Sequence, residues 1–393
     1  MDLNDSADER AFRDEVRAWL EASLPADIRA KVTGYGHLSK DDYLRWHRIL
    51  AAKGWSVPHW PLDWGGTGWD VTRRYIFDEE FGLAGAPMLP PFGPSMCASV
   101  LLRFGTPAQQ QRFLPRIRDG LDFWVQGYSE PGAGSDLASL KTRAVRQGDH
   151  YLVTGQKIWT TLGHYGDWIF CLVRTDPQAA VRQEGISFLL IDMATPGITV
   201  RPLILMDGGH EVNEVFFDEV RVPAENIVFE ENKGWTVAKY LLGHERLGSG
   251  AVGSSRRELA ALKSIAAREQ KNGRPLIDDP RFRDRLSRTE IELDALELTA
   301  MRFLDRMRRT GQPPGADASM LKIRGTEIQQ SITELAMQAV GPMAEPFAAV
   351  DGGTLDPLAS RFAARYCNYR KTTIYAGSNE IQRNIIAKMA LGL

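Results

Sequence analysis

The chain has 393 residues, a length that predicts two or three domains at about 100 to 200 residues per domain. Its 48 Lys and Arg residues nearly balance 50 Asp and Glu residues, so it lacks the basic excess of a protein that binds nucleic acid over a wide surface. No apolar run approaches the roughly 20 residues that a membrane-spanning helix needs. Neither a nucleic-acid partner nor a membrane span is therefore expected.

The first ten residues carry four acidic side chains and no apolar segment, which is not the pattern of a secretory signal or a transit peptide. We therefore expect a cytoplasmic protein. Its three cysteines, Cys97, Cys171 and Cys367, are scattered, and we predict buried thiols in place of disulfides or zinc ligands. The seven histidines form no metal-binding motif, so no protein-bound metal is expected.

Helical periodicity dominates the first third of the chain. Ser6 and Glu9 form a capping box, and apolar residues recur after it at helical spacing as far as Pro25. Further helices are predicted over residues 41–53, 72–83, 95–104 and 108–119. Residues 1–120 are therefore expected to form an all-helical domain.

Short β-branched and aromatic runs replace this pattern from Asp122 onward. They predict strands over residues 123–126, 151–154, 168–174, 186–191, 198–202 and 214–217. We expect residues 121–232 to form a β domain, a small barrel or a sandwich. Helical periodicity returns over residues 235–270, 280–309, 316–339 and 357–375, with a last helix near residues 380–389. Residues 233–393 are therefore predicted to form a helical bundle, which makes the chain an α+β multidomain protein.

Three short motifs stand out as places where chemistry could occur. SEPGAGSD, at residues 129–136, follows a predicted strand and lets backbone amides approach a ligand closely, although a plain turn is the alternative. GQKIWTT, at residues 155–161, places a Trp ring beside two hydroxyls, a combination that can face an isoalloxazine or simply fill a core. IYAGSNEIQR, at residues 374–383, is by itself typical of a helix cap.

Together, in this order and spacing, the three motifs resemble those of the acyl-CoA dehydrogenase family, and the resemblance covers essentially the whole chain. It implies an N-terminal helical domain, a middle β-barrel domain and a C-terminal four-helix bundle. Residues 126–142 and 207–217 are most similar to the large subunits of bacterial pimeloyl-CoA dehydrogenases. The activity implied is FAD-dependent oxidation of an acyl-CoA thioester to its trans-2-enoyl-CoA, with an electron-transfer flavoprotein as acceptor.

This reaction needs a base for the α-proton, an acceptor for the β-hydride and donors for the developing enolate oxygen. The resemblance assigns hydride acceptance to flavin N5 and polarisation of the thioester to the backbone amide of Ala376. Ser135 is assigned to the substrate side as well as to the flavin, and Arg246 is expected to support the CoA side or the local fold. The residues that it implies in FAD binding are Ser129, Gly134, Ser135, Trp159, Thr161, Gln338, Gly341 and Ser378.

The sequence departs from the family pattern at the catalytic base. Many members have Glu where this chain has Ala376, and a methyl group cannot accept a proton. One branch of the family carries its base on the first long helix of the C-terminal domain, where Glu245 stands here, and burial there would raise the pKa of this carboxyl. We expect Glu245 to be the base and Glu380 to be a weaker candidate; without the change at position 376, a solvated surface carboxylate would be the simpler interpretation of Glu245.

A second departure affects the contacts that family members make to a neighbouring subunit's FAD. The family's Arg-x-x-Phe-Gly motif is replaced at residues 269–273, and a glycine-rich loop at the adenine end retains only Gln338 and Gly341. We therefore expect an α2β2 heterotetramer with a second dehydrogenase-like chain, with a homo-oligomer as the alternative. A noncatalytic subunit and an oxidase or flavin monooxygenase of the same fold are the competing functions.

The acyl group is less clearly indicated. Residues 81–102, which line the end of the acyl tail in relatives, carry no charge. Because a buried terminal carboxylate would need a partner, a dicarboxylic substrate is not predicted, and a medium-chain, branched or ring-bearing acyl group fits as well.

Overall fold

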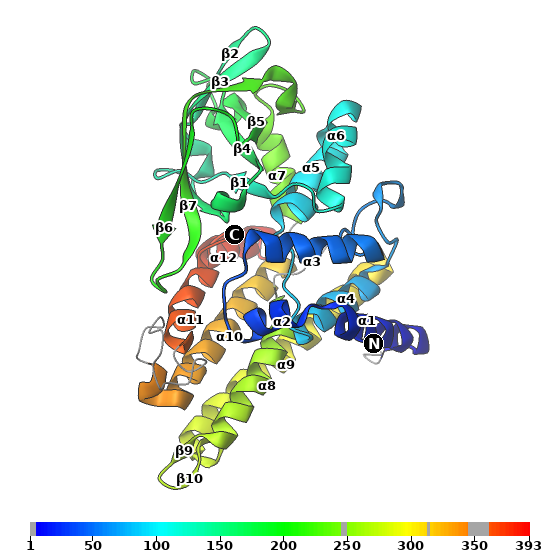
Figure 1. Cartoon of the computed structure of the whole chain (residues 1–393), viewed down its shortest axis with the longest axis vertical. Helices are drawn as coiled ribbons and strands as arrows, with labels where there is room; N and C mark the ends of the chain where they lie inside the picture. The colour runs from blue at the N-terminus through cyan, green and yellow to red at the C-terminus, as the bar shows by residue number, and fades with distance from the viewer. Residues whose placement is uncertain (1–4, 245–249, 313–314, 345–360) are drawn as a thin grey trace. The chain divides into compact units, whose positions relative to one another are not determined.

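The computed structural model describes residues 5–244, 250–312, 315–344 and 361–393. The chain divides into two compact units, both labelled by element in Figure 1. The first unit comprises Met1–Leu38, Trp69–Met88 and Arg246–Leu393, and the second comprises Ser39–Gly68 and Leu89–Glu245. The helical N-terminal third is therefore shared between the two units.

The first unit is built mainly from helices. They are α1 (Ala7–Ser23), α2 (Ala26–Thr33), α4 (Val71–Leu83), α8 (Val252–Arg268), α9 (Pro280–Thr310), α10 (Asp317–Val340), α11 (Phe362–Tyr369) and α12 (Asn379–Ala390), with the short hairpin β9 (Gln270–Lys271) and β10 (Arg274–Pro275). Helix α10 contacts α8, α9, α11 and α12, so it is the central helix of the C-terminal bundle. The bundle encloses an apolar core that includes Leu259, Leu293, Ile328 and Leu335.

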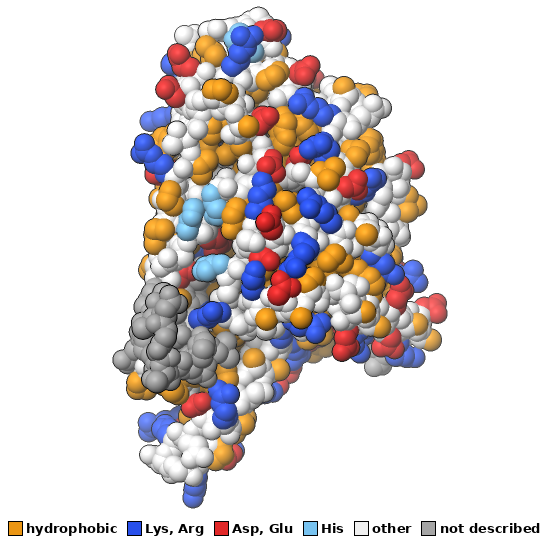
Figure 2. All heavy atoms as spheres, in the orientation of Figure 1, with side chains coloured by type: hydrophobic (Ala, Val, Ile, Leu, Met, Phe, Trp, Pro, Cys, Tyr) orange, Lys and Arg blue, Asp and Glu red, His pale blue; other side chains and the backbone are white. Residues whose placement is uncertain are grey.

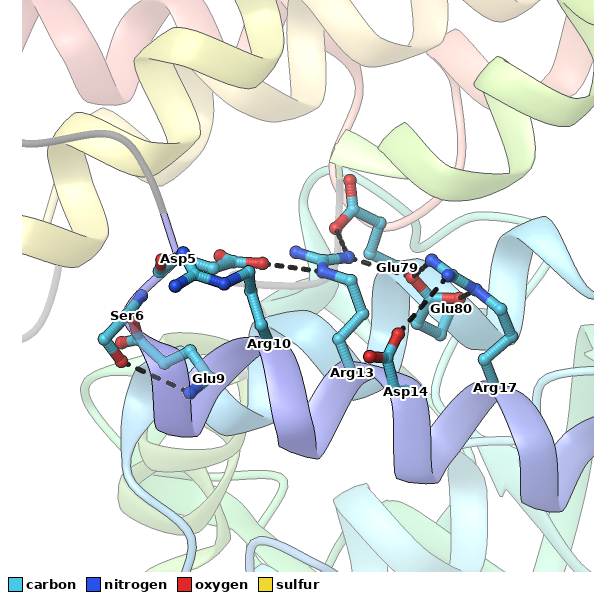
Figure 3. A network of polar contacts seen from close by, with 9 residues as sticks. All are labelled: Asp5, Ser6, Glu9, Arg10, Arg13, Asp14, Arg17, Glu79 and Glu80. Carbon is cyan, nitrogen blue, oxygen red and sulfur yellow. Dashed lines mark hydrogen bonds and ion pairs between the residues drawn. The ribbon is translucent and has the colours of Figure 1, made fainter.

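Helix α1 begins at the predicted capping box and is held to α4 by charged side chains (Figure 3). Arg13 donates to Glu79 and Glu80 over 2.6 and 3.0 Å, and Arg17 donates to Glu80 over 2.9 Å. Glu80 is buried, so these ion pairs satisfy a carboxylate that burial would otherwise penalise. The N-terminal helix is thereby fixed to the first unit.

Helices α4 and α8 cross closely, because glycines stand at their contact. A Cβ on Gly82 would lie 2.5 Å from the amide nitrogen of Ser254, and a Cβ on Gly253 would lie 2.3 Å from the carbonyl oxygen of Glu79. Arg257 reaches across the same crossing and donates to the carbonyl oxygen of Gly82 over 2.6 Å. Segments far apart in the sequence therefore share one core.

The second unit combines helices with one sheet. Its helices are α3 (Lys40–Lys53), α5 (Ala98–Phe104), α6 (Pro107–Arg118) and α7 (Gly234–His244), with a π-helical turn over Phe92–Cys97 before α5. Its strands are β1 (Trp124–Gly127), β2 (Arg143–Gln147), β3 (His150–Thr161), β4 (Trp168–Arg174), β5 (Ile186–Asp192), β6 (Ile198–Ile204), β7 (His210–Pro223) and β8 (Ile227–Val228). All six predicted strands form, β3 and β7 are longer than predicted, and β2 and β8 were not predicted.

The eight strands form a single sheet in the order β6-β7-β3-β2-β4-β5-β8, with β1 added beside β4. Alternate residues of β4 serve two cores, as strand geometry requires. Ile169 and Cys171 pack against the other strands, whereas Phe170 and Leu172 join the core that contains α5, α6 and α7. Among the described strands, β6 and β8 do not pair with each other, so the expected barrel is open between them.

Two predicted helices differ from the structure. The stretch 235–270 is two helices, α7 and α8, and Ala251 stands before α8 with a φ of 47°, a left-handed conformation that no helix contains. The stretch 357–375 is helical only from Phe362 in its described part and passes into a 3₁₀ turn over Arg370–Thr373. Cys97 and Cys171 are buried as predicted, but Cys367 is only partly buried.

The described residues contain no helix that is long and apolar enough to cross a membrane. On the face shown in Figure 2, basic and acidic side chains are interspersed and no broad area carries one sign. This distribution agrees with the formal charge of −2.

Candidate active site

The first two motifs lie side by side in the second unit. Glu130 and Ala133 exchange backbone hydrogen bonds of 2.8 and 2.9 Å, which close the SEPGAGSD segment into a tight turn. The amide of Ile158 then donates to the carbonyl oxygen of Ser129 over 2.9 Å. The first two motifs, which the sequence indicated as separate candidate sites, are therefore adjacent in the structure.

A buried ion pair joins the same two motifs. The side chain of Lys157 is fully buried, and its Nζ donates to Glu130 Oε1 over 2.8 Å and to the carbonyl oxygens of Tyr128 and Leu172. Glu130 also accepts the backbone amides of Lys141 and Thr142. Burial alone would raise the pKa of Glu130, but the ammonium of Lys157 and these hydrogen bonds outweigh it and hold the pKa below its usual value.

The glycine turn leaves room for a ligand. Gly134 has no left-handed φ, and a Cβ placed on it would meet no atom within 4 Å. The chain's own geometry therefore does not require glycine at this position, whereas a ligand that approaches the backbone would. Gly134 and Ser135 are exposed and Ser129 is half-buried, so this turn is accessible to a flavin cofactor.

Trp159 has an unusual backbone conformation. Its φ is 61°, its side chain is 56% exposed, and the pairing of β3 with β7 shifts register between Lys157 and Thr160. A bulky aromatic residue in the left-handed region is strained, and such strain is concentrated at functional sites. The next residue, Thr160, is buried and its Oγ1 has no hydrogen-bond partner in the described structure. The exposed Trp159 ring and the half-buried Thr161 suit an aromatic ligand with polar edges, as FAD is.

The third motif forms a strained turn in the first unit. Ala376 has a φ of 52° and is exposed, and its carbonyl oxygen accepts from Gln382 Nε2 over 3.2 Å. No described residue accepts a hydrogen bond from the amide of Ala376. Ser378 caps α12 by accepting from the amide of Ile381 over 3.3 Å, and its hydroxyl proton is donated to the carboxylate of Glu380.

Buried polar contacts anchor this turn to the central helix of the bundle. Asn379 Oδ1 accepts from Lys322 Nζ over 2.8 Å, and its amide donates to Thr326 Oγ1 over 3.2 Å. Asn379 and Lys322 are both buried, and desolvation lowers the pKa of Lys322. The conformation of the motif is therefore imposed by α10 as well as by its own residues.

Of the two candidate bases, only Glu380 lies among the described residues. Glu245 and Arg246 lie outside the described residues, immediately after α7 ends at His244. Glu380 is exposed, and hydrogen bonds from its own backbone amide and from Ser378 lower its pKa, which weakens it as a base. Within the described residues, no group of acidic, histidine or cysteine side chains is arranged to hold a metal ion.

The residues expected at the adenine end of FAD belong to the first unit. Gln338 is exposed on α10, where it accepts from Arg285 and donates to Glu334 Oε1 over 3.2 Å. Gly341 ends the same helix with a φ of 57°. Residues 269–273, which replace a family motif, contain β9 and the turn of the β9–β10 hairpin at Asn272 and Gly273.

Sequence reasoning missed two features of the site. One is Lys157, a charged residue at a buried position of β3, and the other is Asn213, a polar residue buried in β7 beside Thr160. Polar residues inside otherwise apolar strands were the available signal, because burial of such groups requires partners. Lys157 precedes the strained Trp159 on β3, and Asn213 on β7 pairs with Thr160, the residue that follows it.

Comparison with known proteins identifies the family. Models of the acyl-CoA dehydrogenase N-terminal, middle and C-terminal domains match residues 6–120, 126–220 and 232–391. Acyl-CoA dehydrogenase IpdE1 of Mycobacterium tuberculosis is 39% identical over 395 residues, which cover 98% of each chain. In the ChsE4–ChsE5 complex from Mycobacterium tuberculosis, a chain that is 32% identical has a TM-score of 0.84, with coverage of 100% of this chain and 99% of that one. A chain of the Tcur3481–Tcur3483 steroid ACAD is 30% identical with a TM-score of 0.85 and the same coverage.

These comparisons confirm the architecture that the resemblance implies: a helical N-terminal part, a middle β part and a C-terminal helical bundle. The family is FAD-dependent, and the turn and bulge described above fit that cofactor. The chain therefore belongs to the acyl-CoA dehydrogenase family of oxidoreductases.

Proposed function

We propose that this chain is a catalytic subunit that oxidises an acyl-CoA to its trans-2-enoyl-CoA. The observation that carries the proposal is the strained, exposed Trp159, held beside an open glycine turn by the buried Lys157–Glu130 ion pair. FAD, when bound, supplies the hydride acceptor at N5 and a ribityl hydroxyl beside the thioester. A subunit that had lost catalysis would have no reason to keep the strain at Trp159, which costs about 1–3 kcal/mol.

Five residues of the second unit are proposed to bind the flavin. Trp159 would cover one face of the isoalloxazine, and the hydroxyl of Thr161 would meet its edge. Ser129, Gly134 and Ser135 would bring backbone amides and hydroxyls to the ring edge and the nearby phosphates, with Ser135 also on the substrate side. The space above Gly134 and the exposure of the Trp159 ring support this assignment.

The third motif is proposed to polarise the thioester. The amide of Ala376 has no acceptor in the described structure, so it is available to donate to the thioester oxygen as negative charge develops there. A turn held in the left-handed region presents this donor at a fixed place. Ser378 is proposed to contact the flavin by turning its hydroxyl proton from Glu380 to the cofactor. A backbone donor remains available whatever side chain stands at position 376.

Glu245 is proposed to remove the α-proton, with Arg246 on the CoA side. The two alternative positions are poorly suited to this role, because position 376 carries a methyl group and Glu380 is exposed with a lowered pKa. The variants that test the base are Glu245→Gln and, as the matched control, Glu380→Gln. Loss of a general base costs roughly 10²–10⁴-fold in rate, so Glu245→Gln should bind acyl-CoA but reduce its flavin that much more slowly.

The result is read by anaerobic stopped-flow absorbance of the flavin in the purified assembly. Unchanged reduction in Glu245→Gln would overturn the assignment and, if Glu380→Gln is also unaffected, would favour a noncatalytic subunit whose partner performs the chemistry. Slow reduction in Glu380→Gln alone would move the base to the third motif. Slow reoxidation by oxygen and fast reoxidation by an electron-transfer flavoprotein are expected, whereas fast reoxidation by oxygen would indicate an oxidase or monooxygenase.

We further propose an α2β2 assembly with a second acyl-CoA dehydrogenase-like chain. Two similar structures, the ChsE4–ChsE5 complex and the Tcur3481–Tcur3483 steroid ACAD, each carry two different chain names. In this chain Gln338 is already engaged by Arg285 and Glu334, which supports the loss of its family contact to a neighbouring FAD. Purification of the chain alone should give colourless protein that gains flavin when a homologous second chain is added.

A homogeneous oligomer of this chain with tightly bound FAD would refute the α2β2 assembly without affecting the proposed reaction. The substrate class is tested in the same assembly by flavin bleaching with straight-chain, branched and ring-bearing acyl-CoAs. The steroid ACAD among the similar structures supports a ring-bearing acyl group. Bleaching confined to straight-chain substrates would contradict that preference.

A further inference from the structure

A buried polar network lies beside the strained bulge of β3, and the reaction described above does not use it. Asn213, on β7, is completely buried. Its Nδ2 donates to the carbonyl oxygen of Thr160 over 3.0 Å and lies 3.2 Å from Nδ1 of His164, and its Oδ1 lies 2.7 Å from Nε2 of His210. One side chain thus contacts the bulge and two histidine rings, whose centroids are 4.0 Å apart.

The hydrogen-bonding capacity of these groups fixes their protonation. A backbone carbonyl only accepts, so the amide nitrogen of Asn213 must face Thr160, and Oδ1 must face His210. His210 therefore carries a proton on Nε2, and His164 must leave Nδ1 unprotonated to accept the second amide proton. Burial and the neighbouring His210 lower the pKa of His164, which agrees with a neutral ring.

The turn after β3 folds tightly onto this amide. Gly163 is placed so that a Cβ would lie 3.1 Å from Asn213 Nδ2 and 3.1 Å from Thr160 Cγ2. The preceding residue, Leu162, has a left-handed φ of 54°. The close packing leaves Asn213 little freedom to rotate away from Thr160, because any side chain at position 163 would occupy the same space.

The bulge therefore lies between two buried clamps. Lys157 holds its beginning through Glu130 and two backbone carbonyls, and Asn213 holds its end through the carbonyl of Thr160. Trp159 stands between them with a strained φ, and a strained conformation persists only where its surroundings determine it fully. The ladder alone is insufficient here, because the register of β3 against β7 shifts between Lys157 and Thr160.

We propose that Asn213, oriented by His164 and His210, is the positioning residue that sets Trp159 and Thr161 against the flavin. The proposal rests on the flavin-binding role proposed above for those two residues. Without the amide, the Thr160 carbonyl loses its side-chain donor and the two histidines lose their shared partner, so the peptide that connects Trp159 to Thr161 is held less firmly. The flavin should then bind more weakly and in a less uniform environment.

The test compares two buried asparagines of the second unit in the purified, FAD-loaded assembly. Asn213→Leu removes the clamp, and Asn226→Leu is the matched control, because Asn226 is also buried and its Nδ2 donates to a backbone carbonyl, that of Leu190, over 3.0 Å. Asn213→Leu should weaken FAD binding about tenfold or more, the equivalent of one lost buried hydrogen bond, and should shift the visible absorption band and the midpoint potential of the flavin. Asn226→Leu should lower thermal stability without either shift.

A second variant keeps the test decisive where Asn213→Leu does not fold. Asn213→Asp has the same shape and retains the acceptor toward His210, but it sets a carboxylate oxygen against the Thr160 carbonyl. It should therefore show the same weakening and the same spectral shift. Wild-type FAD affinity and spectrum in either folded Asn213 variant, or shifts of equal size in Asn226→Leu, would overturn the proposal.

Trp159→Ala separates this proposal from the proposed flavin site. Weaker FAD binding in Trp159→Ala together with wild-type behaviour in the Asn213 variants would leave the flavin site standing and remove the role of Asn213. Wild-type FAD binding in Trp159→Ala would instead remove the flavin-binding role on which the proposal rests.

Discussion

Lys157 Nζ lies 2.8 Å from Glu130 Oε1 in the interior of the second unit, and this pair, 27 residues apart in the sequence, connects the first two motifs. Both charged groups are hydrogen-bonded to backbone groups as well as to each other. A buried pair of this kind gains little over apolar packing, but it becomes very costly when one partner is removed. The pair therefore fixes the two motifs relative to each other more than it adds stability.

Replacing Lys157 by Met should lower the free energy of unfolding by about 3–5 kcal/mol, because Glu130 is then buried without its cation. The double variant Lys157→Met, Glu130→Gln should recover part of that loss. Urea denaturation at neutral pH measures both. Arg221→Gln is the control, since Arg221 and Asp149 form an exposed pair that contributes no more than about 1 kcal/mol. Equal losses in the Lys157 and Arg221 variants would contradict this account.

Substituting Trp159 by Gly should change stability and cofactor binding in opposite directions. Glycine relieves the left-handed strain at this position, worth roughly 1–2 kcal/mol, but removes the ring that is proposed to cover the flavin. Denaturation without FAD and equilibrium binding of FAD measure the two effects. Glu219→Gly is the matched control, because Glu219 is also exposed with a left-handed φ of 49° and should gain stability without losing FAD. FAD affinity that falls equally in both variants would contradict the assignment.

Gln382 should act on catalysis through the turn that it holds. Its Nε2 donates to the carbonyl oxygens of Ala376 and Gly377, so Gln382→Met frees the turn that presents the Ala376 amide. We expect kcat to fall roughly tenfold with a smaller change in KM, part of the loss that removal of a whole oxyanion donor causes. The infrared carbonyl stretch of a bound acyl-CoA analogue should also move toward its value in water.

Gln330 provides the control for this experiment. Its Nε2 donates to the carbonyl oxygens of Tyr369 and Arg370, in the turn before the motif. Gln330→Met should therefore reduce stability and leave the carbonyl stretch of the analogue unchanged. A stretch that moves equally in both variants would show that general loosening, and not the Ala376 turn, controls polarisation.

His47 should make the second unit sensitive to acid. It is buried, its Nε2 has no hydrogen-bond partner in the described structure, and burial lowers its pKa from 6.5 to about 4. Between these values the unfolded chain takes up a proton that the folded chain does not, so stability falls as pH falls. This contribution is complete above about pH 6.5, and roughly 3 kcal/mol of it is lost by pH 4.

Urea denaturation across that range, in wild type and in His47→Phe, measures the effect. The Phe variant should lose the part of the pH dependence that His47 causes. His37 is exposed and serves as the matched control, since His37→Phe should retain the wild-type slope. An unchanged slope in His47→Phe would show that other groups govern acid stability.

Long periodic helices and apolar strands could be predicted from the sequence, because local pattern and tertiary environment agree there. Helix α9, strand β4 and the Ser6 capping box are examples. Strand β2 was missed because only Ala144 among its five residues is buried, so it has no apolar alternation to detect. Helical periodicity was followed through the break before α8, although Gly248, Gly250 and Gly253 signalled it.

The sequence predicted the motifs of the candidate site but not the buried contacts that hold them in place. The turn and strand proposed to bind the flavin were identified by resemblance. The buried contacts of Lys157 and Asn213 were not, because charge and amide groups inside a sheet contradict the pattern by which strands are recognised. The domain boundaries at residues 120 and 232, the base Glu245 and the cytoplasmic location stay predictions. So does the finer resemblance to pimeloyl-CoA dehydrogenases.

Arg257 and Gly82 are joined by a hydrogen bond but lie 175 residues apart in the sequence, so Arg257 is synthesised much later than Gly82. Helix α4 leaves the ribosome long before α8, on which it packs through its glycines. At about 5–20 residues per second, roughly 9 to 35 s pass before that partner has been made. During this interval the side of α4 that carries Glu79 and Gly82 has no α8 to pack against, so the nascent chain exposes a surface that the finished protein buries.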